Sequence, residues 1–263
     1  MMTADSGISE SGIRKHLTAE CFGREMEIHA MLDSTNTRAK ILAAAGAPHG
    51  FLVVADSQSA GRGRLGRSFW SPEHSGVYMT VILRPECTAE KASLVTSLAA
   101  VAAARAVEKL SGADVKIKWV NDLYIGGKKI CGILSEAGFR PDGHPDYVAV
   151  GIGVNVLKAE FPPELRDIAG SIRSETGCEP DRNRLAAEIL NELEAVYGQL
   201  ETGEFLEESR RRSNVIGRDV LVFEGGKQYP ARALDIDEQG HLVIRTAGGI
   251  SVLGFGEISL RLH

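Results

Sequence analysis

The chain has few of the residues that build metal cages and disulfide frameworks. Four cysteines occur among its 263 residues, and they are too widely spread to form a C-x-x-C pair or a zinc-ligand pattern. The seven histidines are scattered as well and include no H-E-x-x-H motif. A metal ion held by protein ligands alone is therefore not expected, and free thiols are expected, as in a reducing cytoplasm.

Long hydrophobic runs and an excess of positive charge are also missing. No apolar stretch approaches the ~20 residues that cross a bilayer, and the start of the chain does not have the pattern of a secretory signal. Lysine and arginine number 30 against 35 aspartates and glutamates, a formal net charge of -5. We therefore expect a cytoplasmic protein with no membrane partner and no nucleic-acid partner.

The hydrophobic patterning mixes strands and helices without a regular βαβ alternation, which is typical of the α+β class. Asp33 and Ser34 are expected to begin a helix that ends at Gly46. The glycines at 126–127 suit a tight hairpin turn, because both tolerate positive φ. Other strands are expected at 51–55, 77–83, 115–120, 123–125, 128–137 and 147–156, helices at 89–110 and 182–200, and loops at 56–72 and 161–180.

The pattern changes from about residue 214, where short strands follow one another at close, even spacing. That pattern predicts a small SH3-like β-barrel. We therefore divide the chain into an N-terminal extension (1–27), a main domain (28–212) and a C-terminal SH3-like domain (213–263). The arginine run at 210–212 sits beside two glutamates and is expected to be a solvated helix end.

The segment 61–67, GRGRLGR, carries the strongest local signal. Its glycines let the backbone approach a ligand closely, and its arginines offer forked donors for phosphate or carboxylate. It lacks the GK[ST] ending of a P-loop, and it does not open a helix as dinucleotide-binding loops do. A flexible basic linker is the alternative. Phe69 and Trp70 argue against a linker, because aromatic side chains there would be exposed unless they pack on something.

Two further segments contain charged side chains among apolar neighbours, KWVND (118–122) and GGKKICGILSE (126–136). A lysine in a semi-buried strand is costly unless it meets an anionic ligand. Lys128 and Lys129 could instead protect an exposed sheet edge. Asp122 could hold a magnesium ion, orient an incoming amine or cap the local turn.

Short polar side chains mark two more positions. STN (34–36) lies at a predicted helix N-terminus, where simple capping explains Ser34. GIGVNV (151–156) is an apolar strand in which Asn155 is the one conspicuous polar residue. Taken alone, neither segment indicates a ligand.

In this order and spacing, STN, Q-x-x-GRGRxGR-x-[FW]-x-SP, KWxND, GKKxxGIL-x-E and GIGxNV resemble the catalytic domain of biotin–protein ligases over about 28–212. The small C-terminal β-domain also fits that family. The resemblance implies a mixed and largely antiparallel sheet flanked by helices, as in class II synthetases. One departure is Val120, where the family usually has proline.

The resemblance further implies an enzyme that uses ATP and Mg²⁺ to form biotinyl-5′-AMP from biotin. It would then transfer biotin to the ε-amine of a lysine on a biotin carboxyl carrier protein or domain. Repressor members of the family carry a winged helix-turn-helix, for which the N-terminal region looks too short, so no operator binding is expected.

The resemblance implies roles for individual residues. The catalytic residues would be Arg64, Lys129 and Asp122. The biotin and biotinyl-AMP site would comprise Ser34, Thr35, Asn36, Gln58, Gly61, Arg62, Gly63, Arg64, Arg67, Lys129, Gly132, Ile133 and Leu134. The nucleotide would be bound by Phe69, Trp70, Asn121 and Asn155.

Two other functions remain open on the sequence alone. A lipoate–protein ligase would share the fold and a catalytic lysine, but its family has a different Gly/Arg signature. A non-enzymatic binding module could be built on the C-terminal domain and the arginine run at 210–212. We also expect that the segment 61–70 is disordered without ligand, and that a homodimer could form through an edge strand.

Overall fold

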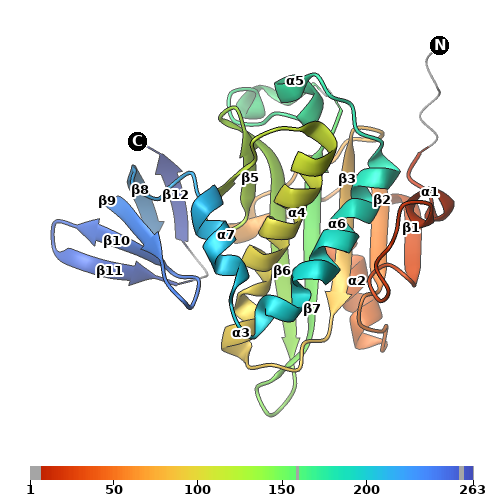
Figure 1. The fold of residues 1–263 in the computed structure, drawn as a ribbon, viewed down its shortest axis with the longest axis horizontal. Helices are drawn as coiled ribbons and strands as arrows, with labels where there is room; N and C mark the ends of the chain where they lie inside the picture. Colours follow the sequence, from red (N-terminus) through yellow and green to blue (C-terminus); the bar gives the residue numbers. More distant parts are fainter. Residues whose placement is uncertain (1–6, 158–159, 255–257, 263) are drawn as a thin grey trace.

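The computed structural model describes residues 7–157, 160–254 and 258–262 (Figure 1). A seven-stranded sheet in the order β1-β2-β3-β7-β6-β5-β4 forms the main body. β1 and β2 are parallel and the other neighbours are antiparallel, which confirms the predicted mixed sheet. The strands are β1 (Met26–Leu32), β2 (Leu52–Gln58), β3 (Gly76–Leu83), β4 (Lys116–Lys118), β5 (Asp122–Ile125), β6 (Lys128–Phe139) and β7 (Pro145–Asn155).

Helices cover both faces of this sheet (Figure 1). Leu52 and Val54 of β2 face the large core beneath α4 and α6. Val53 between them faces a smaller cluster beneath α2, because successive strand residues point to opposite faces. The helices are α1 (Glu10–Arg14), α2 (Thr35–Ala44), α3 (Ala89–Ser93), α4 (Val95–Ser111), α5 (Ile172–Thr176), α6 (Arg182–Tyr197) and α7 (Phe205–Arg212), with 3-10 turns at Arg64–Gly66, Pro163–Leu165 and Gly198–Leu200. None of the helices in the described part of the chain is both long and apolar enough to cross a membrane.

The C-terminal domain is a five-stranded antiparallel sheet in the order β11-β10-β9-β8-β12. Several of its apolar residues, among them Val222, Ile236 and Leu242, join the same core as the main body, so the two parts pack together. Within the described residues no ladder joins β11 to β12, and the predicted SH3-like domain is seen as an open sheet. Its strands are β8 (Asp219–Glu224), β9 (Lys227–Ile236), β10 (Leu242–Thr246), β11 (Gly249–Leu253) and β12 (Ile258–Leu262).

Several predicted elements are shorter or broken. The helix expected at 89–110 is interrupted at Leu94, whose N–H donates to Lys91 O in a tighter turn. The strand expected at 115–120 ends at Lys118, because Asn121 N donates back to Lys118 O and turns the chain. The loop expected at 161–180 contains α5, which begins with a capping box at Ser171.

Other predictions concern the ends of elements. Gly126 and Gly127 have φ of 58° and 87°, and they form the predicted hairpin turn. Gly46 has φ of 94° beyond the end of α2, as predicted. Ser34 is the N-cap of α2, but its side chain makes no capping hydrogen bond, so the capping explanation of this serine is wrong. β1 was not predicted at all, because this edge strand is only partly buried and shows no clean alternation.

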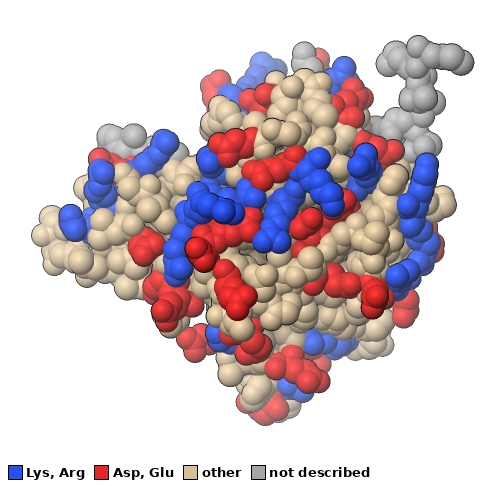
Figure 2. Space-filling view, viewed as in Figure 1, with Lys and Arg blue, Asp and Glu red and all other residues tan. Residues whose placement is uncertain are grey.

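The arginine run at the end of α7 is only in part a solvated helix end, because the Arg211 side chain is 75% exposed whereas Arg212 contacts two glutamates. The Arg212 side chain is 13% exposed, and its guanidinium contacts Glu108 Oε1 at 2.6 Å and Glu208 Oε1 at 2.7 Å. α7 packs against α4, which brings this last turn against the acidic side chains of both helices. Figure 2 shows basic and acidic side chains interleaved over this face. The run is therefore part of an ion-pair network between helices, which weakens the case for a binding surface there.

Candidate active site

A cavity of about 860 Å³ opens between the N-terminus of α2, the glycine–arginine loop and the middle of the main sheet. This is within the range of small-molecule sites in proteins. Two glycines on β7, Gly151 and Gly153, form part of the cavity surface on the sheet. A Cβ on Gly151 would lie 2.0 Å from Asn36 Oδ1, and one on Gly153 would lie 2.6 Å from the Phe69 ring. The two glycines therefore let the side chains of Asn36 and Phe69 lie directly against the sheet at the wall of the cavity.

Nearly all residues predicted for the site line this cavity. They come from α2, the end of β2, the loop before β3, and β5 to β7. Gly61 does not line it. Its carbonyl accepts a hydrogen bond from Phe69 N, and a Cβ there would lie 2.3 Å from Phe69 O, so Gly61 lets the loop close on itself. The predicted residues on the wall are Ser34, Thr35, Asn36, Gln58, Arg62, Gly63, Arg64, Arg67, Phe69, Trp70, Asn121, Asp122, Lys129, Gly132, Ile133, Leu134 and Asn155.

The STN segment forms a polar wall that is already cross-linked. Thr35 N and Oγ1 both donate to Gln58 Oε1, at 2.9 and 3.2 Å. Asn36 Nδ2 donates to Leu134 O and to Glu136 Oε2, and its Oδ1 accepts from Thr80 Oγ1. These contacts fix the amide of Asn36 in one orientation. Asn36 and Gln58 therefore hold the shape of the wall, in addition to any contact with a ligand.

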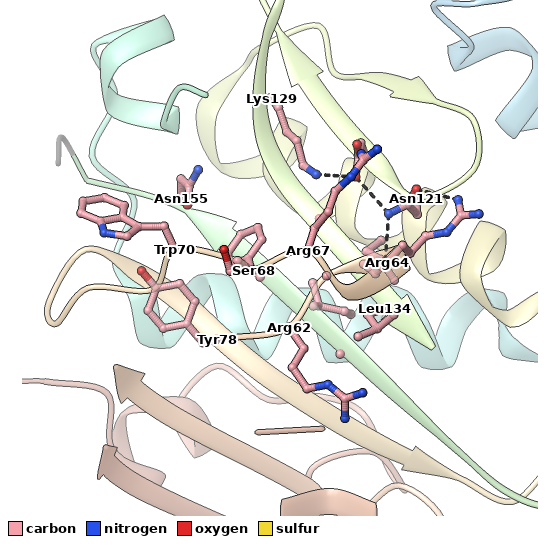
Figure 3. A pocket seen from close by; sticks show the side chains of 18 of the residues that line it. Arg62, Arg64, Arg67, Ser68, Trp70, Tyr78, Asn121, Lys129, Leu134 and Asn155 are labelled. Atoms are coloured by element: carbon pink, nitrogen blue, oxygen red, sulfur yellow. Dashed lines mark hydrogen bonds and ion pairs between the residues drawn. The ribbon is translucent and has the colours of Figure 1, made fainter. Parts of the chain in front are cut away.

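A cationic cluster lies at one end of the cavity. Lys129 Nζ is 2.7 Å from Asp122 Oδ1, and Asn121 Nδ2 donates to the same oxygen at 3.0 Å. Arg64 Nη1 in turn donates to Asn121 Oδ1 at 3.1 Å (Figure 3). Burial lowers the pKa of Arg64, while the nearby Asp122 opposes that shift. The guanidinium still stays charged at neutral pH, because its ordinary pKa is far higher.

The charge of this lining is strongly one-sided. Its cations are Arg62, Arg64, Arg67, Lys118 and Lys129, and Asp122 is the one carboxylate among the described residues on the wall. Such a cavity attracts an anion. Arg62 differs from the other arginines, since its side chain points away from Arg64 and Lys129 (Figure 3) and meets Glu136 at 3.2 Å.

The other end of the cavity is aromatic. Trp70 packs on Phe161 with ring centroids 5.3 Å apart, and Phe69 meets Tyr78 edge-on at 6.3 Å. Burial raises the pKa of Tyr78 to about 12, so the phenol stays protonated. Asn155 lies at this end, whereas Asn121 lies with Arg64 (Figure 3). The residues predicted for nucleotide binding are therefore split between the two ends.

Sequence reasoning missed several lining residues. Lys118 faces the cavity with Nζ 5.9 Å from the Tyr124 ring. Its place in the KWVND segment was a usable signal, because Lys118 pairs with Asp122 across a two-strand turn. Trp119 also lines the cavity, and its Nε1 donates to Gly240 O of the C-terminal domain at 2.9 Å. No local signal could have revealed that contact.

Comparison with known proteins identifies the family of the chain. Residues 28–155 match the model of the biotin/lipoate A/B protein ligase family, and residues 215–261 match the biotin protein ligase C-terminal domain. The chain is 39% identical to the bifunctional ligase/repressor BirA of Bacillus subtilis, over 96% of this chain and 79% of that one. It is 32% identical to the biotin–[acetyl-CoA-carboxylase] ligase of Mycobacterium tuberculosis, over 95% of each chain. The chain belongs to the biotin protein ligase family.

A solved structure of the family has the same fold. The biotin protein ligase from Aquifex aeolicus, in complex with biotin and ATP, superposes with a TM-score of 0.78 at 29% identity. The match covers 91% of this chain and 100% of that one. The family fold thus includes both the main sheet and the C-terminal domain.

Mg²⁺ would find limited protein ligation in this cavity. Asp122 is the one described carboxylate on the wall, and it already pairs with Lys129. Mg²⁺ at nucleotide sites is usually held by one or two carboxylates together with substrate phosphates and water. The residues fit an ion that would arrive with ATP and be held mainly by the phosphates and water.

Proposed function

We propose that this protein is an ATP-dependent biotin–protein ligase. It forms biotinyl-5′-AMP and transfers biotin to a lysine of a biotin carboxyl carrier protein or domain. The observation that carries the proposal is the cavity itself, in which the segments that resemble the family converge on one chamber with a cationic end and an aromatic end. The names of the relatives, and the biotin and ATP bound by the Aquifex aeolicus protein, support the same reaction.

Biotin requires a dry chamber with a few oriented polar groups, since its ring system is neutral and its tail carries one carboxylate. Residues 132–134 of β6 line the wall on which we place the rings. The Ser34 hydroxyl lies on the wall without capping α2, so we assign it a hydrogen bond to the ring system. Gln58 is held by Thr35 and faces the cavity from β2.

The first step joins a carboxylate to a polyanion. A biotin carboxylate oxygen attacks the α-phosphorus of ATP, and the bond to pyrophosphate breaks. Both reactants are negative, so fixed positive charge must offset their repulsion and the charge of the transition state. Arg64, Arg67 and Lys129 supply that charge from two elements of the cavity wall, and Lys118 adds a fourth cation. Bound Mg²⁺ would neutralise phosphate charge and orient the leaving pyrophosphate.

The second step transfers the acyl group to an amine. The acceptor lysine attacks as its neutral amine, so its ammonium group first gives a proton to solvent. The nitrogen then bonds to the carbonyl carbon of the adenylate, the bond to AMP breaks, and the proton that the new amide nitrogen loses also passes to solvent. We assign Asp122 the role of orienting this amine, since a carboxylate attracts the ammonium group that a free lysine carries at neutral pH. The aromatic end formed by Trp70 and Phe161 supplies apolar surface for the adenine base.

Isotope exchange tests the proposal. The purified protein is incubated with labelled pyrophosphate, ATP and Mg²⁺, and transfer of label into ATP is measured with biotin, with lipoate and with neither acid. We expect exchange with biotin alone. Exchange with lipoate alone would make the protein a lipoate–protein ligase, and no exchange from folded protein would leave the binding-module hypothesis.

The remaining parts of the prediction belong to this proposal. The identity of the carrier acceptor, the magnesium ion, the cytoplasmic location, the absence of operator binding and the homodimer stay predictions. The lipoate alternative is not favoured, because the curated relatives at 39% and 32% identity are named as biotin ligases or ligase/repressors.

A further inference from the structure

The loop that carries the glycine–arginine segment leaves β2 at Gln58 and returns to β3 at Gly76. Its outgoing limb is attached by backbone bonds from Ser59 N to Leu32 O and from Ala60 N to Asp33 O. Its returning limb passes through His74, whose φ of 57° lies in the left-handed region. Non-glycine residues adopt that conformation rarely, and histidine, asparagine and aspartate adopt it more readily than most. The surroundings of His74 must therefore stabilise it.

One carboxylate holds His74 by two bonds. His74 N donates to Asp56 Oδ2 at 3.2 Å, and His74 Nδ1 lies 2.7 Å from the same oxygen. The other oxygen of Asp56 accepts from Arg182 Nη1 at 2.5 Å. Arg182 is the first residue of α6, is 3% exposed, and also donates to Gly76 O. A chain of contacts thus runs from the helix layer through the sheet to the exposed loop.

The contacts beyond His74 extend to both sides of the cavity. Ser75 Oγ meets the phenol of Tyr78, a residue of the cavity wall, at 2.9 Å. Ser75 O also accepts from Val156 N and Leu157 N, at the start of the segment that leads to Phe161. A shift of this limb would move the aromatic end of the cavity together with the loop.

We propose that His74 is a positioning residue that anchors the returning limb of the active-site loop to the protein body through Asp56 and Arg182. The anchor holds the loop over the adenylate, an assignment that rests on the proposed ligase function. Asp56, Glu73 and His74 have the donor atoms of a metal site within 4.8 Å. The buried guanidinium of Arg182 already pairs with Asp56, and a second cation there would be repelled.

A matched pair of variants tests the anchor. The side chains introduced by His74→Asn and His74→Asp have nearly the same size, and both residues tolerate the left-handed conformation. Only the asparagine keeps an N–H donor toward Asp56, whereas the aspartate places a like charge against it. Glu73→Gln is the control, because this exposed neighbour faces the other ring nitrogen at 3.5 Å. Asp56 itself is left unchanged, since its removal would leave the buried Arg182 without its carboxylate and could unfold the protein.

The first measurement is independent of activity. With biotin present, so that the loop is closed in the wild type, trypsin should cut after the arginines at 62, 64 and 67 at a rate that follows the open population. We expect His74→Asp to be cut about tenfold faster than the wild type, which corresponds to about 1.4 kcal/mol. His74→Asn and Glu73→Gln should stay within about twofold. Equal rates for the aspartate and asparagine variants would overturn the anchor.

The second measurement links the anchor to the reaction. Adenylate formed from biotin and ATP is isolated on the enzyme, and its release is followed over time. His74→Asp should release it about tenfold faster than the wild type, whereas His74→Asn should release it at about the wild-type rate. If wild-type protein makes no adenylate, the proposed function fails while the trypsin result still decides the anchor. If adenylate forms but all variants release it equally, His74 does not position the loop.

Discussion

Replacing Lys129 by methionine should do more than delete one cation. Its Nζ lies 2.7 Å from Asp122 Oδ1, and the two side chains are 31% and 19% exposed. The substitution removes positive charge from the place where the α-phosphate is expected. It also leaves the Asp122 carboxylate facing that phosphate without its partner. The variant therefore loses an attraction and gains a repulsion.

The size of each effect follows from the geometry. Removing one electrostatic group from a transition-state site typically costs ~3–4 kcal/mol. Two unit charges about 4 Å apart interact by about 4 kcal/mol at an effective dielectric constant of ~20. Because both side chains are partly exposed, solvent screening should reduce the repulsion from Asp122 to about 2 kcal/mol. Together these effects predict a loss of roughly 10⁴-fold in pyrophosphate exchange for Lys129→Met.

A double-mutant cycle separates the two effects. Asp122→Asn should lower exchange in the wild-type background, because Lys129 loses the carboxylate that orients it. In the Lys129→Met background the same change should raise exchange by roughly thirtyfold, since it removes the repulsion of about 2 kcal/mol. The neighbouring Lys128→Met is the matched control. Lys128 Nζ contacts Arg166 O and Asp167 O, away from the phosphate end, so its loss should change exchange less than threefold or so.

The assay is the initial rate of biotin-dependent exchange at saturating ATP and biotin, with folding checked by circular dichroism. Wild-type exchange by Lys129→Met would show that the assigned site is wrong. A double variant slower than Lys129→Met alone would refute the electrostatic reasoning, because Asp122 would then help even without its lysine.

Three other changes test other parts of the structure. Arg64→Ala should reduce exchange by roughly 10²–10³-fold with little change in the melting temperature, because it removes a charged group at the reacting phosphate; retention of full exchange would exclude that role. Gly151→Ala places a Cβ 2.0 Å from Asn36 Oδ1, so the side chain of Asn36 must move. Calorimetry should therefore show biotin affinity reduced about tenfold or more. An unchanged affinity would mean that biotin does not use the wall formed by Asn36. For Glu194, burial is outweighed by hydrogen bonds from the backbone of Phe22, Glu20 and Cys21, which keep its pKa below the ordinary 4.5. Its stabilisation is therefore present above pH 4.5 and is lost as pH falls further, so in urea titrations the wild type should exceed Glu194→Gln at pH 7 and the difference should shrink by pH 3.

Local sequence signals predicted the elements whose geometry depends on near neighbours. The turn at Gly126 and Gly127 needs two positive φ angles, and the end of α2 at Gly46 needs one, which glycine allows without strain. The buried strands β3 and β7 show as continuous apolar runs. Nearly every residue that the motifs predicted for the site lies on the cavity wall, because each motif lies on its own strand end or loop. Other wall residues, such as Tyr78, Lys118 and Phe161, were not predicted.

Predictions failed where the position of a residue depends on a contact with a segment far away in the sequence. β1 is held by its pairing with β2, and its own residues show little alternation. Arg212 looked solvated because its run is charged, yet it is partly buried and pairs with Glu108, more than a hundred residues earlier. The same holds for Trp119, which meets Gly240 only because the C-terminal domain packs against the main sheet.

By itself, then, the sequence determined the chemistry of this protein: which side chains are present, at what spacing, and on which short elements. Those properties follow from bonds within a few residues and from the periodicity of burial. The tertiary structure decided how the chemistry is arranged. Arg62 pairs with Glu136 and does not join the cationic cluster around Lys129. Asn121 and Asn155 lie at opposite ends of the cavity, and His74 anchors the active-site loop to the protein body. These arrangements depend on the packing of segments far apart in the chain, which no local pattern specifies.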